Sequence, residues 1–206
     1  MAAERAPSAR RGRLALAALA ALLLGLGAWQ LGDAAWIHAK ARLAQVLLEQ
    51  AWATRLAAGE AVPPWPWADT HPVSRLNAPD LGVDQIVLAG ATGRTLAFGP
   101  GHVHGSAPPG EAGHAILTGH RDTHFGFLER LAPGSLLQVQ RPDGTWRRYR
   151  VSGAEVLDSR AVALAPDPGR PVLSLVTCWP FDAIDPGTPW RYVVTAEATT
   201  EAGPRN

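Results

Sequence analysis

The sequence predicts an all-β domain, a small barrel or sandwich, behind a helical N-terminal region. Two observations carry this prediction. After residue 72, short runs rich in Val, Leu, Thr and aromatic residues are separated by Gly, Pro, Asn and Asp, which is the pattern of short strands joined by tight turns. Before residue 60, Ala and Leu dominate and favour helix. The expected strands are residues 73–76, 85–88, 95–98, 114–120, 136–141, 145–157, 172–178 and 191–196.

Local signals mark some of the connections in the β-domain. Pro142-Asp143-Gly144 predicts a hairpin turn, because proline presets φ and glycine tolerates a positive φ. Residues 125–131 are expected to form a single helical turn. About 125 residues is enough chain for one packed core.

Residues 14–31 are almost entirely Ala, Leu and Gly. A membrane-spanning helix needs about 20 apolar residues, with about 17 as the lower limit, so this segment is just long enough. Residues 1–13 hold four arginines and predict a cytoplasmic tail, with the rest of the chain outside. The alternative is a cleaved signal peptide, which the small residues Gly25, Gly27 and Ala28 would permit.

Residues 32–60 predict an amphipathic helical stalk. Asp33 would cap it and Gly59 would end it, and we expect its apolar stripe to pack on the following domain. Residues 61–72 form a linker rich in Pro and Trp, which proline stiffens. The β-domain is expected over residues 73–198 and a disordered tail over 199–206.

Composition excludes several classes of function. The 19 Lys and Arg balance the 18 Asp and Glu, so the chain carries no nucleic-acid footprint. A single cysteine excludes an internal disulfide framework and a Cys-rich zinc site. His102 and His104 lie in a glycine-rich turn with no cysteine beside them, so we expect no metal and no cofactor.

Three residues with complementary chemistry lie at predicted strand boundaries. Cys178 ends an apolar run just before Pro180, which cannot continue a ladder. His120 ends another apolar run, and an imidazole can take the proton of a thiol. Arg191 opens the last strand. Its guanidinium stays protonated and therefore cannot act as a base, but it is a good hydrogen-bond donor to an oxyanion. Its alternative role is an ion pair with Asp122, Asp182 or Asp185.

Together these segments resemble the sortase family of membrane-anchored cysteine transpeptidases. The family's histidine, cysteine and arginine fall on His120, Cys178 and Arg191. The resemblance covers roughly residues 65–197 and is closest to the sortases of proteobacteria (Gram-negative bacteria). It implies a closed β-barrel of about eight strands, and a chain held in the inner membrane by a single span with its catalytic domain in the periplasm.

The resemblance also implies a reaction. Cys178 would cleave the Thr–Gly bond of a C-terminal sorting signal similar to Leu-Pro-any-Thr-Gly through a thioester, and an amine acceptor in the cell envelope would resolve it. Thr177 would line the substrate groove. The loop after the long strand would receive apolar side chains of the signal through Ala161, Val162, Ala163 and Leu164.

Two other functions stay open from the sequence. One is a membrane-anchored cysteine hydrolase or protease that has no acceptor amine. The other is a non-enzymatic envelope β-domain, in which Cys178 is a core residue. A papain-like protease is disfavoured, because there the cysteine precedes the histidine and opens a helix.

Overall fold

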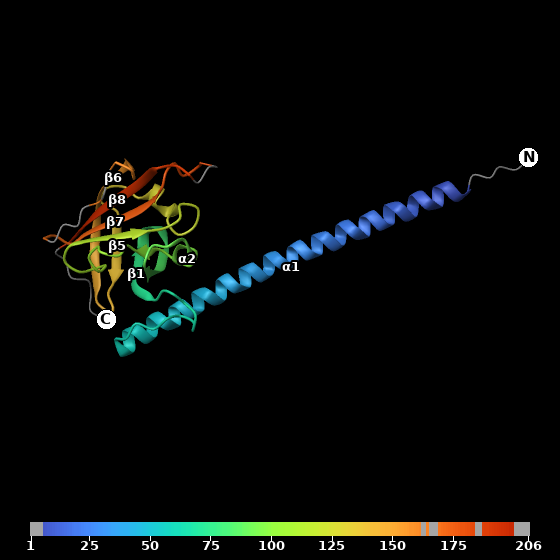
Figure 1. Cartoon of the computed structure of the whole chain (residues 1–206). Coiled ribbons are helices and arrows are strands. Elements are labelled where there is room, and N and C mark those ends of the chain that lie inside the picture. The colour runs from blue at the N-terminus through green and yellow to red at the C-terminus, as the bar shows by residue number, and fades with distance from the viewer. Residues whose placement is uncertain (1–5, 162–163, 165–168, 184–186, 200–206) are drawn as a thin grey trace, which may run out of the picture. The chain divides into compact units, whose positions relative to one another are not determined.

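Helix α1 (Ala6–Ala58) is continuous, although the sequence predicted a membrane segment followed by a separately capped stalk (Figure 1). The computed structural model describes residues 6–161, 164, 169–183 and 187–199. Asp33 lies inside the helix rather than at its start, because the Ala-rich and Leu-rich residues on both sides of it favour helix. Gly59 ends the helix as predicted: its φ is 76°, and its N–H donates to the Arg55 carbonyl at 2.8 Å.

The chain divides into two compact units, Met1–Leu43 and Ala44–Asn206. Within the first unit, the helix is long and apolar enough to cross a membrane, and its leucines are exposed. The predicted apolar N-terminal helix is therefore present, with a length that suffices for a bilayer.

The second unit begins with the last turns of α1, which pack on the β-domain. Leu48 and Trp52 are buried against Ile86 and Leu88. The Trp52 indole N–H also donates to the side chain of Gln140 at 3.1 Å. The expected packing of the stalk is confirmed for this part of the helix.

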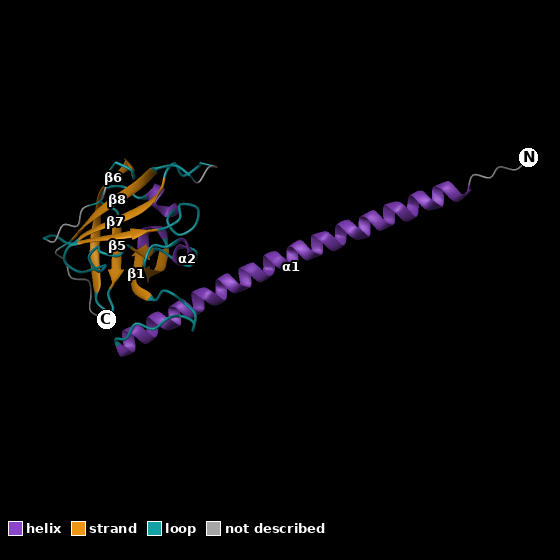
Figure 2. Cartoon of the chain, viewed as in Figure 1, coloured by secondary structure: helices purple, strands orange, loops and turns teal. Residues whose placement is uncertain are grey.

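Eight strands close into a barrel, which confirms the predicted fold class (Figure 2). Their order around the barrel is β1-β2-β3-β4-β7-β8-β6-β5, and β5 pairs with β1. The pairs β2–β3 and β4–β7 are parallel and the others are antiparallel. The strands are β1 (Pro72–Ala78), β2 (Val83–Ala89), β3 (Gly101–His102), β4 (His114–Thr118), β5 (Leu136–Gln140), β6 (Trp146–Asp158), β7 (Val172–Cys178) and β8 (Trp190–Ala198).

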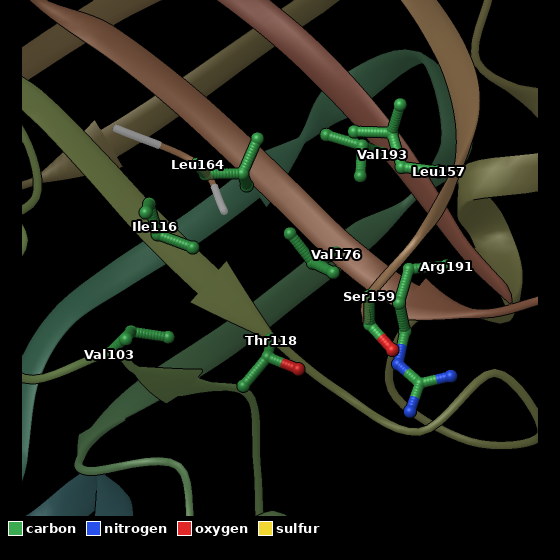
Figure 3. Close-up of a pocket in the computed structure, with 9 residues that line it drawn as sticks. All are labelled: Val103, Ile116, Thr118, Leu157, Ser159, Leu164, Val176, Arg191 and Val193. Atoms are coloured by element: carbon green, nitrogen blue, oxygen red, sulfur yellow. The ribbon is translucent and has the colours of Figure 1, made fainter. Parts of the chain in front are cut away.

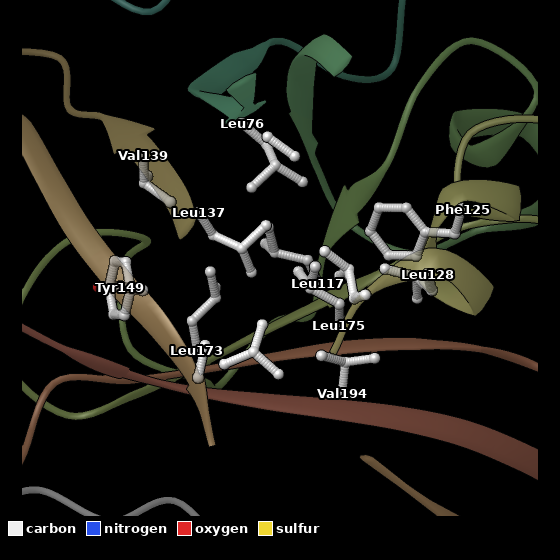
Figure 4. Close-up of a cluster of buried hydrophobic side chains, with 14 of the residues drawn as sticks. Leu76, Leu117, Phe125, Leu128, Leu137, Val139, Tyr149, Leu173, Leu175 and Val194 are labelled. Atoms are coloured by element: carbon white, nitrogen blue, oxygen red, sulfur yellow. The ribbon is translucent and has the colours of Figure 1, made fainter. Parts of the chain in front are cut away.

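The barrel interior is filled by alternate residues of its strands (Figure 4). On β7, Leu173 and Leu175 are fully buried there, and Leu117 of β4 and Val194 of β8 join them. Because successive side chains of a strand point to opposite faces, the residues between them lie on the outer face of the barrel.

One strand prediction is wrong and one strand was missed. Residues 95–98 were expected to be a strand, but Gly93–Leu96 forms the short helix α2. The Thr92 side chain accepts a hydrogen bond from the Thr95 N–H and starts that helix. Strand β3, only two residues long, lies just after it.

Other local predictions are confirmed or lie partly outside the described residues. The turn expected over 125–131 is the 3₁₀ helix η2 (Gly126–Arg130); a second one, η1 (Pro79–Leu81), follows β1. The hairpin turn at Gly144 is present, with φ at 82°. Of the tail predicted to be disordered, only Thr199 is described, and its N–H donates to the Arg148 carbonyl.

Candidate active site

Strands β4 and β7 bring His120 and Cys178 to the same edge of the sheet. The two strands run parallel, with Thr118 opposite Val176. The Gly119 N–H continues the pairing by donating to the Val176 carbonyl at 3.2 Å. His120 lies two residues beyond Thr118, and Cys178 two residues beyond Val176, so the two predicted residues follow matching positions on neighbouring strands.

Cys178 and Arg191 face each other across β7 and β8. The Trp179 N–H donates to the Trp190 carbonyl at 3.0 Å, which makes the neighbouring Cys178–Arg191 pair a non-hydrogen-bonded one. In such pairs the Cα atoms are about 4.5 Å apart and the side chains are at their closest. The register therefore sets the two side chains next to each other where they leave the backbone.

A cavity of about 350 Å³ lies on the outer face of β4, β7 and β8 (Figure 3). This volume is within the range of small-ligand sites, and most of the lining is aliphatic. Arg191, the register partner of Cys178, is one of the cavity's lining residues. The lining residues are Val103, Ile116, Thr118, Leu157, Ser159, Leu164, Val176, Arg191 and Val193.

Of the predicted groove residues, Leu164 lines this cavity. Ala161 is exposed in a turn after β6, and Val162 and Ala163 lie outside the described residues. Thr177 does not have the predicted position. It is 2% exposed, it shares the inward face of Leu175, and its hydroxyl donates to the Gly119 carbonyl at 2.7 Å.

The guanidinium of Arg191 is held by main-chain carbonyls of its own loop. One of its nitrogens donates to the carbonyls of Thr188 and Trp190, at 2.7 Å and 2.9 Å. Among the described residues no ion pair joins it to Asp122 or Asp182, since Asp122 pairs with Arg121 instead; Asp185 lies outside that part of the chain. The remaining guanidinium nitrogens are thus available to a ligand in the cavity.

His120 is exposed and sits in a tight turn. Its carbonyl accepts a hydrogen bond from the Phe125 N–H at 2.9 Å. Burial lowers the pKa of His124, and the charge of His120 lowers it further. The imidazole of His120 is therefore open to the solvent at the rim where Cys178 lies.

Of the cavity lining, sequence reasoning identified Arg191 and Leu164 and missed the other residues, among them Val103, Leu157 and Ser159. The β6 residue Leu157 pairs with Arg191, and the Ser159 hydroxyl donates to the Pro189 carbonyl at 2.7 Å. Alternation along β6 could have indicated Leu157. Nothing in the sequence reveals that Val103, from the segment after β3, returns to this face.

Of the two histidines weighed as metal ligands, His102 bonds to the Ala107 carbonyl at 2.9 Å. The buried His114, on β4, bonds to Ser174 at 2.8 Å. Within the described ranges, no three His, Cys, Asp or Glu side chains come together in a way that could hold a metal ion.

The site is thus a thiol, an imidazole and a guanidinium at one rim of a closed β-barrel, next to an apolar cavity. The chain belongs to the sortase family: the family model described as "Sortase domain" matches residues 76–199. This match covers the strands that carry His120, Cys178 and Arg191.

Known sortases resemble the chain in sequence and fold. Sortase D of Bacillus subtilis (strain 168) is 27% identical over 126 residues, which are 61% of this chain and 63% of that protein. The chain therefore spans less than two thirds of the length of this relative. The crystal structure of sortase C-1 from Actinomyces oris is 30% identical, with a TM-score of 0.56, over 63% of this chain and 74% of that one.

Sortase A from Corynebacterium diphtheriae supports the fold alone. It is 23% identical with a TM-score of 0.59, and the alignment covers 79% of this chain and 86% of that one. These relatives are from Gram-positive bacteria, so they lend no support to the predicted likeness to proteobacterial sortases.

Proposed function

We propose that this protein is a sortase-type cysteine transpeptidase, with Cys178 as nucleophile, His120 as acid and base, and Arg191 as oxyanion donor. The observation that carries the proposal is the non-hydrogen-bonded cross-strand pair of Cys178 and Arg191, because Arg191 also lines the apolar cavity. His120, at the end of the parallel neighbour strand, completes the set.

The first half of the reaction forms a thioester. His120 takes the thiol proton, and the thiolate of Cys178 attacks the carbonyl carbon of the Thr–Gly bond in a signal similar to Leu-Pro-any-Thr-Gly. Arg191 donates to the oxyanion that develops; a positioned donor of this kind contributes about 2.7–4 kcal/mol. The protonated imidazole then gives its proton to the departing glycine amine.

The second half transfers the acyl group. An amine acceptor of the cell envelope loses a proton to His120 and attacks the thioester carbonyl, and the Cys178 thiolate leaves. The products are a new amide on the target protein and the free enzyme. Water in place of the amine would give hydrolysis, which is the chemistry of a cysteine hydrolase without an acceptor.

The aliphatic cavity is the proposed site for the apolar residues of the signal. Leu164 supplies one wall in the described part of the loop after β6. Ala161, Val162 and Ala163 belong to the same loop, and contact of these residues with the signal is part of the proposal. No cofactor is required by this mechanism, because the thiol, imidazole and guanidinium supply all the proton and charge transfers.

The apolar first unit supports a membrane anchor. In the proposed topology the arginine-rich residues 1–13 stay in the cytoplasm, residues 14–31 of α1 span the inner membrane once, and the catalytic unit works in the periplasm. This location rests on the motif resemblance to proteobacterial sortases.

Mass spectrometry of the full-length protein tests the function directly. The protein is incubated with a Leu-Pro-any-Thr-Gly-like peptide, with and without a small amine, and Cys178→Ala serves as the control. We expect an acyl adduct on Cys178 and, with the amine, a peptide–amine product. Adduct followed by hydrolysis alone would favour the hydrolase, and absence of both adduct and cleavage would leave a non-enzymatic β-domain.

A further inference from the structure

We propose that Arg121 is a positioning residue, which holds His120 in place relative to Cys178. This inference rests on the proposed function of His120 and Cys178 and adds a residue to it. Arg121 directly follows His120, but its side chain turns away from the solvent and is buried, with 7% of the residue exposed. A charged group is costly to bury unless its donors are occupied.

The donors of Arg121 reach the segment that follows the nucleophile. Its two terminal nitrogens donate to the carbonyls of Pro180 and Ala183, each at 2.6 Å. Its Nε donates to Asp122 at 3.1 Å, and that carboxylate is 75% exposed. Hydrogen bonds from a charged donor are stronger than neutral ones, so the guanidinium ties the turn after β4 to the segment after β7.

The residue before His120 is also fixed to β7. The Gly119 N–H donates to the Val176 carbonyl at 3.2 Å, and the Thr177 hydroxyl donates to the Gly119 carbonyl at 2.7 Å. His120 is thus held on both sides: Gly119 is bonded to the residues just before Cys178, and Arg121 to those just after it. This arrangement, which we call the histidine frame, consists of Gly119, Arg121 and Thr177.

The histidine frame has a consequence for catalysis. The His120 side chain is exposed, so packing around the ring cannot fix its distance from the thiol. The backbone on either side must do so, and a misplacement of about 1 Å can cost about 10²-fold in rate. Arg121 and Thr177 therefore act through His120, without touching the substrate.

The test uses alkylation of Cys178 by iodoacetamide as a function of pH, which needs no substrate. His120→Gln defines the profile of a thiol without its imidazole. We expect Arg121→Met to move the wild-type profile towards that of His120→Gln and to lower kcat about 10²-fold with little change in KM. The alkylation profile of Arg121→Lys, whose ammonium can reach one of the two carbonyls, should lie between those of the wild type and Arg121→Met. Thr177→Val should shift the profile in the same direction as Arg121→Met.

The matched control is Arg150→Met. Arg150 also donates to a loop carbonyl, that of Gly134 at 2.9 Å, but it lies on β6 and is exposed. Its loss should leave the alkylation profile and kcat unchanged. Thermal unfolding of each variant identifies any variant that fails to fold. If Arg121→Met fails to fold, the alkylation profiles of Arg121→Lys and Thr177→Val test the positioning role in its place.

The outcomes separate this inference from the proposed function. A wild-type profile in Arg121→Met, together with an altered one in His120→Gln, would overturn the positioning role and leave the function intact. A wild-type profile in His120→Gln would overturn the pairing of imidazole and thiol, and the role of Arg121 with it.

Discussion

The two faces of strand β7 differ in what surrounds them. Leu173, Leu175 and Thr177 point into the barrel, and all three are nearly or fully buried. Val176 and Cys178, on the outer face, are only half-buried and lie along or just beyond the cavity. One strand thus supplies core packing on one face and a reactive thiol on the other, so substitutions on the two faces should separate stability from activity.

Cys178→Ala should have the largest effect on activity. Removing the nucleophile is expected to abolish cleavage of a Leu-Pro-any-Thr-Gly-like peptide, because no thioester can form. The melting temperature should be nearly unchanged, since the thiol is outside the buried core. Chromatographic assay of the peptide and thermal unfolding measure both. Residual cleavage at the wild-type rate would remove the nucleophile assignment.

Leu175→Ala should give the converse result. Leu175 is fully buried in the barrel, and such a truncation lowers the free energy of unfolding by about 2–5 kcal/mol. The turnover per folded molecule should stay at the wild-type value. Urea unfolding gives the stability. A large loss of kcat in the folded variant would show that the two faces are not separable.

Arg191→Lys is expected to lower kcat by about 10²–10³-fold, the usual result of losing an oxyanion donor. An ammonium group cannot keep the bonds to the Thr188 and Trp190 carbonyls and also donate to the substrate in the geometry of a guanidinium. Steady-state kinetics measure the loss. Unaltered turnover would mean that Arg191 only supports its own loop.

Val176→Ala sharpens the comparison with a smaller change on the outer face. Val176 lines the cavity and is half-buried. We expect KM to rise about 10-fold with kcat retained, because two buried carbons of apolar contact with the substrate are lost. Val194→Ala, on the inner face of β8, is the matched control and should reduce stability without changing KM. Equal KM values in the two variants would contradict the assignment of the cavity to the substrate.

The smallest expected effect concerns pH. Burial lowers the pKa values of His71 and His102 from 6.5, so the folded protein favours the neutral rings. Their contribution to stability is complete above pH 6.5 and decreases as the pH falls below it, because the unfolded chain binds protons more readily. The melting temperature should fall between pH 7 and pH 5, and less steeply in His102→Gln. A steeper fall of the melting temperature in His102→Gln would contradict the lowered pKa of His102 in the folded protein.

The barrel was predictable from sequence, whereas its irregular parts were not. Strand β7 is indicated by an apolar run rich in β-branched residues, and β6 by the hairpin turn at Gly144 that precedes it. Residues 95–98 carry similar residue types, but they follow a helix start: the Thr92 side chain accepts a hydrogen bond from the Thr95 N–H and caps the helix α2. Strand β3 is too short to have any periodicity.

The candidate site shows a similar division. His120, Cys178 and Arg191 were identified by chemistry and by their places at strand ends. Thr177 was assigned to the groove, although the period of two from Leu173 and Leu175 would have set it inside the barrel. Arg121 gave no signal, since its partners are main-chain carbonyls 59 and 62 residues away, and every residue type carries such a carbonyl.

The burial of Leu48 and Trp52 bears on where the chain can be shortened. A shortened version that starts at the first strand would expose Ile86 and Leu88 to water and would lose the indole bond to Gln140. We expect such a truncated form to aggregate. A cut near Ala44 removes the apolar first unit and leaves the last turns of α1 covering the barrel wall, so this is where a well-folded fragment of the second unit should begin.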